Sequence, residues 1–303
     1  MAGQTGVRRG WIASTLAALA LLCAVTGPML GIEWPVSPIV LMGTFGEYEG
    51  SHFDGGIDLG GGEREVYPML PGELLFYHEE GEDPLDLPTG LGSFVVIDHD
   101  KGLRSLYAHL KAGSISAETT TFTQTTAVGI TGDTGSSYGT HLHFAIIDRE
   151  FNQVVNPLLL LDPIVDTKKP VIEGVSVIAG SQRIPLIDGA YLPSGTYRLA
   201  ITAYDVSEHV RYFYPMAVFS IEVFHNGEQL YKITHEALQV KGSEVVLAQS
   251  PGLPFEAYYI DQWTVSPGEL ALNPGDTRIE VVVRDYTGNE TVRTFMVHAR
   301  ESE

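Results

Sequence analysis

Apolar and polar residues alternate in many short runs along this chain, and glycine, proline or asparagine separates one run from the next. Residues 93–99 and 103–110 are clear examples, and the polar segment Asp100-Lys101-Gly102 joins them. Alternation with a period of two is typical of a strand with one buried face, and a short polar connection favours a hairpin. No helical periodicity of useful length occurs between residues 35 and 165. The pattern therefore predicts an all-β fold.

The segment from Asn156 to Pro170 divides the chain, because prolines and charged residues interrupt the alternation there. We predict an antiparallel β-sheet domain over 35–163, a linker over 164–170 and a second domain over 171–303. The second part again consists of alternating runs, at 171–178, 197–204, 220–224, 229–233, 243–247, 278–285 and 291–298. About seven strands at this spacing predict an immunoglobulin-like β-sandwich. The hairpin signal Asp285-Tyr286-Thr287-Gly288-Asn289 resembles bacterial immunoglobulin-like modules.

The N-terminus has the pattern of an export signal, which we place at residues 1–31. Arg8 and Arg9 precede an apolar run from Trp11 to Val25, which is short for a transmembrane span. An uncleaved anchor and lipid modification of Cys23 remain as alternatives. Cys23 is the only cysteine, so removal of the signal leaves no cysteine in the mature chain. The mature chain then forms no disulfide, and any metal site must use histidines and carboxylates.

Charge and composition narrow the possible functions. The 303 residues carry a formal net charge of −20, from 38 acidic and 18 basic residues. Nucleic-acid binding needs a basic footprint that displaces counterions from phosphates, so the charge disfavours that role. We expect an exported protein of the periplasm, the cell envelope or the extracellular space.

Several possible metal donors are spaced in a way that allows them to converge. His141 and His143 are two residues apart in an apolar run, so a strand would present both imidazoles on one face. Asp54 and Asp58 lie in the glycine-rich segment 54–62, and His109 ends the run 103–110. An isolated pair of alternating histidines is ordinarily structural, so the case for a metal depends on the whole set.

These donors lie in motifs that resemble the lysostaphin-type (LytM-like) zinc metallopeptidases, which cut peptide cross-links in bacterial cell walls. The resemblance extends from about Gly43 to Leu161. It is carried by 56–59 (Gly-Ile-Asp-Leu), 106–110 (Leu-Tyr-Ala-His-Leu), 132–135 (Gly-Asp-Thr-Gly), 140–144 (Thr-His-Leu-His-Phe) and 155–157 (Val-Asn-Pro). The resemblance implies a LytM-like antiparallel β-sheet peptidase domain that holds one zinc ion.

The same resemblance implies roles for individual residues. Asp58 and His143 would be zinc ligands, and His109 and His141 would flank the reacting water. The family's first ligand is a histidine four residues before the aspartate, and here Asp54 occupies that position. Aspartate can bind zinc, but two carboxylates on one dication make the site formally neutral and the metal a weaker Lewis acid. His52 is a second candidate for the missing ligand, although we regard it first as a neighbour.

Because Asp54 stands where the family has a histidine, the sequence allows two functions of different classes. The first is a secreted zinc metalloendopeptidase, a hydrolase that cleaves peptidoglycan peptides with Asp54, Asp58 and His143 as metal ligands. The second is a catalytically degenerate LytM-like module that binds wall peptides or regulates a cell-wall hydrolase. Retention of His109 and His141 favours the enzyme. A cell-envelope protein is a further expected partner, through the C-terminal domain.

Overall fold

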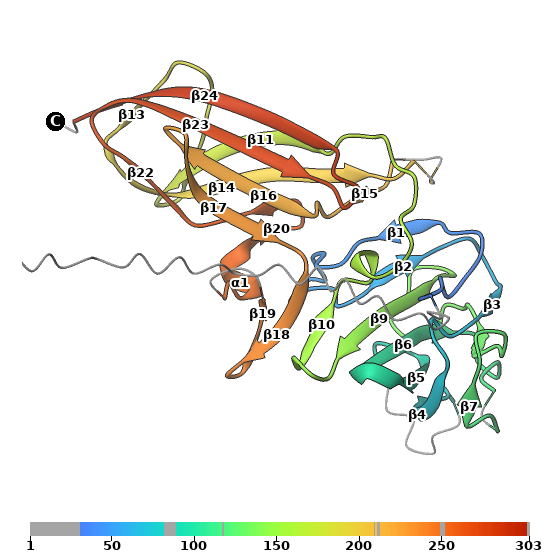
Figure 1. Ribbon diagram of the computed structural model, residues 1–303. Coiled ribbons are helices and arrows are strands. Elements are labelled where there is room, and N and C mark those ends of the chain that lie inside the picture. The colour runs from blue at the N-terminus through green and yellow to red at the C-terminus, as the bar shows by residue number, and fades with distance from the viewer. Residues whose placement is uncertain are drawn as a thin grey trace, which may run out of the picture. The chain divides into compact units, whose positions relative to one another are not determined.

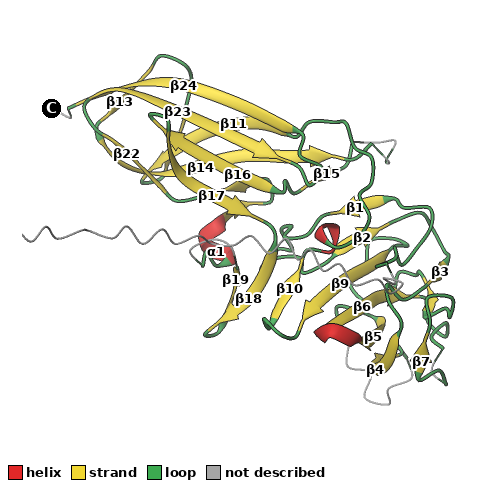
Figure 2. Cartoon of the chain, viewed as in Figure 1, coloured by secondary structure: helices red, strands yellow, loops and turns green. Residues whose placement is uncertain are grey.

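Strands dominate the computed structural model of the chain, which Figure 2 colours by secondary structure. It describes residues 31–81, 89–116, 118–208, 210, 213–248 and 252–301, and the described residues from Ile32 onward form one compact unit. The signal peptide predicted at 1–31, with Cys23, falls outside the described residues except for Gly31. Helical structure in the described part is limited to α1 (Phe255–Tyr258), η1 (Asp100–Gly102) and η2 (Pro157–Leu159). The predicted all-β fold is confirmed.

The peptidase-like motifs lie in an antiparallel sheet of ten strands, counted over the described residues (Figure 1). Its main path runs β19 (Glu244–Leu247), β18 (Ala237–Lys241), β10 (Gln153–Val155), β9 (Leu142–Asp148), β6 (Leu103–Leu110), β5 (Ser93–His99), β4 (Gly72–His78) and β7 (Thr121–Phe122). The short strand β2 (Ile57–Leu59) pairs with β9 and with β1 (Leu41–Gly43). Nearby, β3 (Glu65–Val66) pairs with β8 (Gly129–Ile130).

The centre of this sheet follows directly from the sequence pattern. Strands β5 and β6 have the predicted bounds, and the turn between them includes Lys101 in the left-handed region at φ 62°. In β5 every second residue is buried, so Val95 and Ile97 point into the core. On β9 the buried Leu142 and Phe144 point the same way, which leaves the residue between them on the opposite face.

Two further sheets are formed by residues after 170. One contains β12 (Gln182–Pro185), β11 (Val171–Ala179), β14 (Gly195–Val206), β21 (Thr264–Val265), β20 (Tyr259–Asp261), β15 (Pro215–Met216) and β22 (Glu269–Leu272). The other has the order β13 (Ala190–Pro193), β24 (Glu290–Arg300), β23 (Gly275–Arg284), β16 (Ser220–His225) and β17 (Glu228–Thr234). The predicted hairpin at Asn226-Gly227 joins β16 to β17, with both residues at positive φ. That this pair of sheets is immunoglobulin-like stays a prediction.

One strand assignment in the second part of the chain was wrong. The run 243–247 was assigned to the C-terminal sandwich, but β19 pairs with β18, and β18 pairs with β10 of the ten-stranded sheet. Alternation identifies a strand and its buried face, but it does not identify the strand's partner. Asn156 strengthens this junction, because its side-chain amide donates to the carbonyl of His235 at 2.8 Å.

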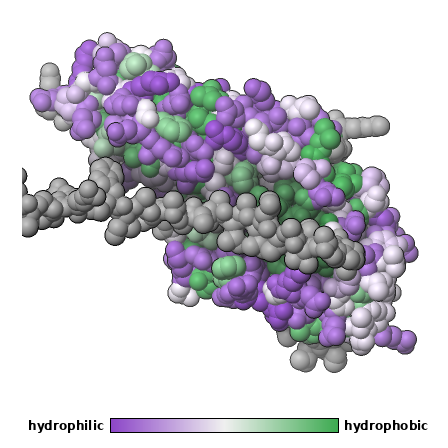
Figure 3. All heavy atoms as spheres, in the orientation of Figure 1, coloured by the Kyte–Doolittle hydropathy of each residue, from purple (hydrophilic) through white to green (hydrophobic). Residues whose placement is uncertain are grey.

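The surface of the described residues is largely hydrophilic on one face. Figure 3 shows one face of the molecule, on which hydrophilic residues predominate among those coloured. Among the described residues, no helix has the length and apolar character needed to cross a membrane.

Candidate metal centre

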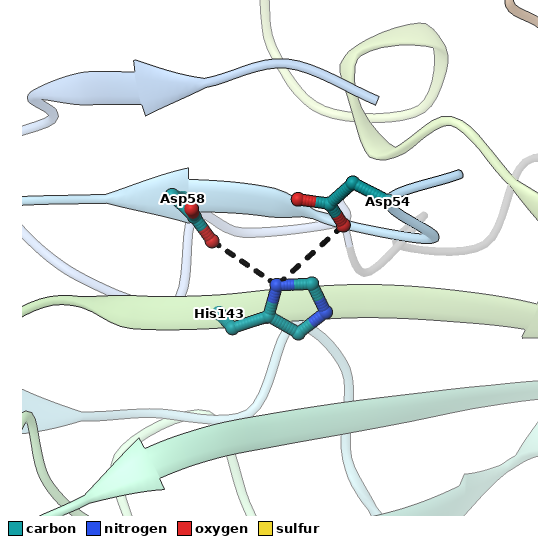
Figure 4. Close-up of side chains that lie close together, drawn as sticks. All are labelled: Asp54, Asp58 and His143. Atoms are coloured by element: carbon teal, nitrogen blue, oxygen red, sulfur yellow. Dashed lines mark hydrogen bonds and ion pairs between the residues drawn. The ribbon is translucent and has the colours of Figure 1, made fainter. Parts of the chain in front are cut away.

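Asp58 and His143 stand opposite each other on paired strands. The β2–β9 register aligns Asp58 with His143, between the aligned pairs Ile57–Phe144 and Leu59–Leu142. Those flanking residues are buried, so alternation turns Asp58 and His143 together to the other face of the sheet. Their side chains meet there, with Nδ1 of His143 3.0 Å from Oδ1 of Asp58 (Figure 4).

Asp54 reaches the same point from the segment that leads into β2. Its Oδ1 atom lies 3.7 Å from Nδ1 of His143, and the side chain is 6% exposed. The backbone N–H of Gly56 donates to this Oδ1 at 2.8 Å, which orients the carboxylate toward the imidazole. One ligand atom from each of Asp54, Asp58 and His143 lies within 4.8 Å of the others. The structure thus brings together the three metal ligands predicted from the sequence.

His109 joins the cluster through an irregularity in β6. Across the β5–β6 pair, Ser93 is aligned with Leu110 and Val95 with Tyr107, so β6 holds one extra residue there. This is a β-bulge, and His109 within it has a φ of 56°. In a regular strand Ala108, which is aligned with His143, would share that face and His109 would point away. The bulge instead places the His109 ring 5.9 Å from the His143 ring.

His141 precedes β9 and completes the group. Its ring centroid is 4.8 Å from that of His109, and its Nε2 lies 3.7 Å from Oδ1 of Asp58. Its Nδ1 faces the carbonyl oxygen of Gly139 at 2.7 Å. His109 is held in the same way, with Nδ1 2.8 Å from the carbonyl oxygen of Thr134. Each Nδ1–H donates to a backbone carbonyl, which leaves Nε2 of each ring as the atom available for chemistry.

The ionisation of the three possible ligands is strongly coupled. Burial raises the pKa of Asp54 to about 6, although the charge of His143 opposes the shift. Burial also favours a higher pKa for Asp58. The hydrogen bond from His143 and the charge of His143 outweigh burial, so the pKa of Asp58 is lowered. Burial disfavours the charged form of His143, yet Asp54 and Asp58 raise its pKa to about 9. In the metal-free chain a proton on His143 therefore offsets part of the charge of the two carboxylates, at the place where a dication would bind.

The pKa of His109 is lowered, in contrast to that of His143. Burial and the neighbouring charges of His141 and His143 lower its pKa to about 4, against the hydrogen bond to Thr134. His109 is therefore neutral at neutral pH. With Nδ1–H donated to Thr134, its Nε2 lone pair can accept a proton.

Two other histidines of the same domain lie apart from this centre. His52 is exposed, and it is not a member of the group of converging donors found among the described residues. His99 is buried, where its ring nitrogens lie 3.0 Å from the carbonyl oxygen of Pro71 and 2.7 Å from Oγ of Ser105. His99 is therefore a structural histidine.

Sequence reasoning missed the groups that hold these side chains in place. A side chain at Gly56 would come within 2.6 Å of Cε1 of His143, so only glycine fits there without a shift. Thr134 supplies the carbonyl that orients His109, and its hydroxyl bridges β5 and β6 by accepting from N–H of Ser93 and donating to the carbonyl of Leu110. The family motif at residues 132–135 indicated that this turn is important. It did not indicate that the carbonyl oxygen of Thr134 orients the His109 ring.

A family model for peptidase family M23 matches residues 52–157, which include all five side chains of the cluster. This segment is an M23 peptidase domain. The resemblance to lysostaphin-type peptidases that the motifs indicated is therefore confirmed. A second family model matches residues 169–300 and carries no functional description.

Several solved structures are similar to parts of this chain. A zinc-containing peptidase from Vibrio cholerae is 21% identical, over 41% of this chain and 37% of that chain, with a TM-score of 0.34. The catalytic domain of the prophage-encoded M23 protein EnpA from Enterococcus faecalis, in a mutant form, is 25% identical, over 40% and 91%, with a TM-score of 0.34. The SpoIIQ–SpoIIIAH pore-forming complex is 24% identical, over 44% and 91%, with a TM-score of 0.36. A comparison with curated proteins gives no match.

Proposed function

We propose that this chain is an exported zinc metalloendopeptidase that cleaves peptide bonds in peptidoglycan. Asp54, Asp58 and His143 would hold the zinc ion, and His109 and His141 would handle protons beside it. The observation that carries the proposal is the convergence of three donors and two further imidazoles, those of His109 and His141, at one place on the sheet.

The donor set fits a zinc ion. Ligand atoms in a tetrahedral site about 2.0–2.2 Å from the metal lie roughly 3.3–3.6 Å apart. Nδ1 of His143 lies 3.0 Å from the Asp58 oxygen and 3.7 Å from the Asp54 oxygen, on either side of that range. Small side-chain movements would therefore suffice, and loss of the proton on His143 would free its lone pair for the metal.

The chain's own residues supply the proton transfers. When bound, zinc would act as a Lewis acid on the scissile carbonyl and make a water more acidic. Nε2 of His109 could take a proton from that water, because this ring is neutral and fixed by Thr134. His141 presents its own Nε2 4.8 Å away, ring centre to ring centre, where it could stabilise the developing oxyanion or pass a proton to the leaving amine.

A specific observation keeps the degenerate module as the second candidate. The hydrogen bond between His143 and Asp58 satisfies both groups without a metal, and the acidic Asp54 replaces a neutral ligand. A protein of this kind would use the same face of the sheet to bind wall peptides or to regulate a hydrolase.

Zinc content and cleavage of isolated peptidoglycan, measured together, separate the two functions. The variants are His143→Ala, Asp54→His and, as a control, Asp100→Asn, which alters an exposed carboxylate in the same domain. The peptidase hypothesis predicts one zinc per chain and cleavage in the parent and Asp100→Asn, and loss of both in His143→Ala. No zinc and no cleavage in the parent, with both appearing in Asp54→His, would establish the degenerate module.

Location and partners belong to the same proposal. We place the protein in the periplasm, cell envelope or extracellular space, with a cell-envelope partner for the C-terminal domain. Fractionation of cells that express the full chain, or the chain without 1–31, tests export. Cytoplasmic retention of the full chain would contradict it.

A further inference from the structure

Three buried carboxylates meet at one point outside the M23 domain. Asp166 belongs to the segment before β11, Asp205 to β14, and Asp285 directly follows β23. They are 8%, 0% and 1% exposed, and one oxygen from each lies within 4.8 Å of the others. Buried like charges repel strongly at this separation, so the cluster needs a positive charge or protons to be stable.

Asp205 is the member of the cluster whose carboxylate lacks hydrogen-bond partners. Neither carboxylate oxygen has a hydrogen-bond partner among the described residues, although the side chain is fully buried. The backbone amide of Val206 is close enough to favour the charged form, but it does not make a hydrogen bond with acceptable geometry. A buried carboxylate without partners is costly, and such groups in folded proteins are ordinarily bonded to protein, water or an ion.

The Asp285 carboxylate is held firmly in place. Its Oδ1 accepts from the N–H and hydroxyl of Thr287 and the N–H of Asn289, at 2.8, 2.9 and 2.9 Å. Its Oδ2 accepts from the Asn289 side-chain amide at 2.8 Å. Asp166 is anchored by the N–H of Lys168, which donates to its Oδ1 at 3.0 Å. These contacts explain why two carboxylates stay near Asp205, but they do not neutralise it.

One positive charge near the cluster comes from Lys168, which favours the charged form of Asp205. Its ammonium group donates to the carbonyl of Ser207 at 2.9 Å. Burial and the three carboxylates raise the pKa of Tyr286, so its hydroxyl is neutral beside them.

We propose that Asp166, Asp205 and Asp285 bind a calcium ion. All available donors are oxygens, which calcium prefers, whereas zinc and copper favour nitrogen or sulfur. Calcium–oxygen distances of about 2.3–2.6 Å place ligands on opposite sides of the ion roughly 5 Å apart, so a group within 4.8 Å can surround it. The ion would join the predicted linker 164–170 to β14 and to the turn that follows β23.

Access from solvent is available on the side of Asp166. Asp166 and Thr287 contribute to the wall of a pocket of about 370 Å³, together with Trp34, Asp162 and Tyr286. Water molecules from this pocket could complete the coordination shell, because calcium takes six to eight oxygens.

Calcium binding is tested by thermal unfolding of the full chain after chelator treatment. The background combines His143→Ala with Asp54→Asn and Asp58→Asn, so that the M23 centre keeps none of its three converging donors. We expect calcium at about 100 times its dissociation constant to raise the unfolding temperature by roughly 5 °C or more, and magnesium to do so less. Equilibrium dialysis should find one additional calcium per chain.

Two variants and a matched control test whether the three aspartates form the calcium site. Asp205→Asn should abolish the calcium-induced shift, whatever it does to stability without calcium. Asp166→Asn serves if Asp205→Asn does not fold. Asp276→Asn, which removes an exposed carboxylate beside His298, should keep the shift. No uptake of calcium at 10 mM by the chain with the M23 donors removed, or an equal shift in Asp205→Asn, would overturn the proposal and leave a protonated Asp205 as the explanation.

Discussion

Nδ1 of His143 lies 3.0 Å from Oδ1 of Asp58, and the strand register places these residues directly opposite each other. Because β2 and β9 are hydrogen-bonded along this stretch, the approach of the two side chains is set by the sheet itself. Asp54 lies outside a strand, and its oxygen is 3.7 Å from the same nitrogen. The centre therefore has a fixed pair and a third donor whose place depends on the segment 54–56.

Gly56→Ala should weaken zinc binding through the position of His143. The added methyl group would come within 2.6 Å of Cε1 of His143 and within 2.7 Å of the carbonyl oxygen of Phe144, so the ring or strand must move. Loss of ligand placement ordinarily costs about 10–100-fold in metal affinity. Competition with a chelator measures the change.

Gly55→Ala is the matched control for this substitution. Its methyl group would meet only Cγ1 of Val154 at 3.7 Å, which is ordinary van der Waals contact. Zinc affinity should stay within about two-fold of the parent. Equal losses in the two variants would show that the segment, and not the contact with His143, determines the affinity.

His109→Gln and His141→Gln should separate metal binding from catalysis. Neither imidazole is among the three converging donors, so one zinc per chain should remain. Cleavage should fall about 100-fold or more, because a positioned general acid or base contributes roughly 10²–10⁴ to the rate. Metal analysis and a peptidoglycan release assay on the same preparations give both values. The exposed His52→Gln is the control, and its loss of zinc would instead make His52 a ligand.

The sequence predicted much of this site because strand pairing obeys simple periodicity. Alternation in 140–144 was enough to turn His141 and His143 to one face, and the motifs supplied Asp58 and Asp54. The position of His109 could not be derived in this way. Its side chain reaches the centre through a β-bulge and a φ of 56°, and neither is visible in a pattern of apolar and polar residues.

Local patterning also limits how much of the strand pairing can be predicted. Residues 93–99 and 103–110 were predicted with the bounds of β5 and β6, because a local turn sets their pairing. Residues 243–247 form a strand as predicted, but it lies in the ten-stranded sheet. Its partner β18 is adjacent in the chain, but β18 pairs with β10, which is far away in the chain. That pairing depends on which sheet edge is open, which local patterning does not encode.

Leu238→Ala should show that this addition to the ten-stranded sheet supports stability. Leu238 is aligned with Val154 of β10 and is 2% exposed. Truncation of a buried leucine costs about 2–5 kcal/mol, so the free energy of unfolding in urea should fall by that amount. Val240→Ala alters a residue of the same strand that is 61% exposed, and it should cost less than about 0.5 kcal/mol. Equal effects of the two variants would contradict a buried packing role for β18.

His235 should make the protein less stable in mild acid. It is 3% exposed, its Nε2 lies 3.1 Å from the hydroxyl of Tyr258, and burial lowers its pKa to about 4. The unfolded chain, with a histidine pKa of about 6.5, therefore binds more protons than the folded chain between these two values. The contribution of His235 is present in full above pH 6.5 and is lost as the pH falls toward 4.

His235→Phe removes this titration while it keeps an aromatic ring at the position. Its absolute stability can differ from that of the parent, because the contact with Tyr258 is lost. The informative quantity is the fall in the free energy of unfolding from pH 7 to pH 5, measured in urea at both values. That fall should be smaller in His235→Phe by about 1–2 kcal/mol, as expected for the cited shift. His52→Phe, at an exposed position, should keep the parent's fall, and an unchanged fall in His235→Phe would show that His235 does not titrate on unfolding.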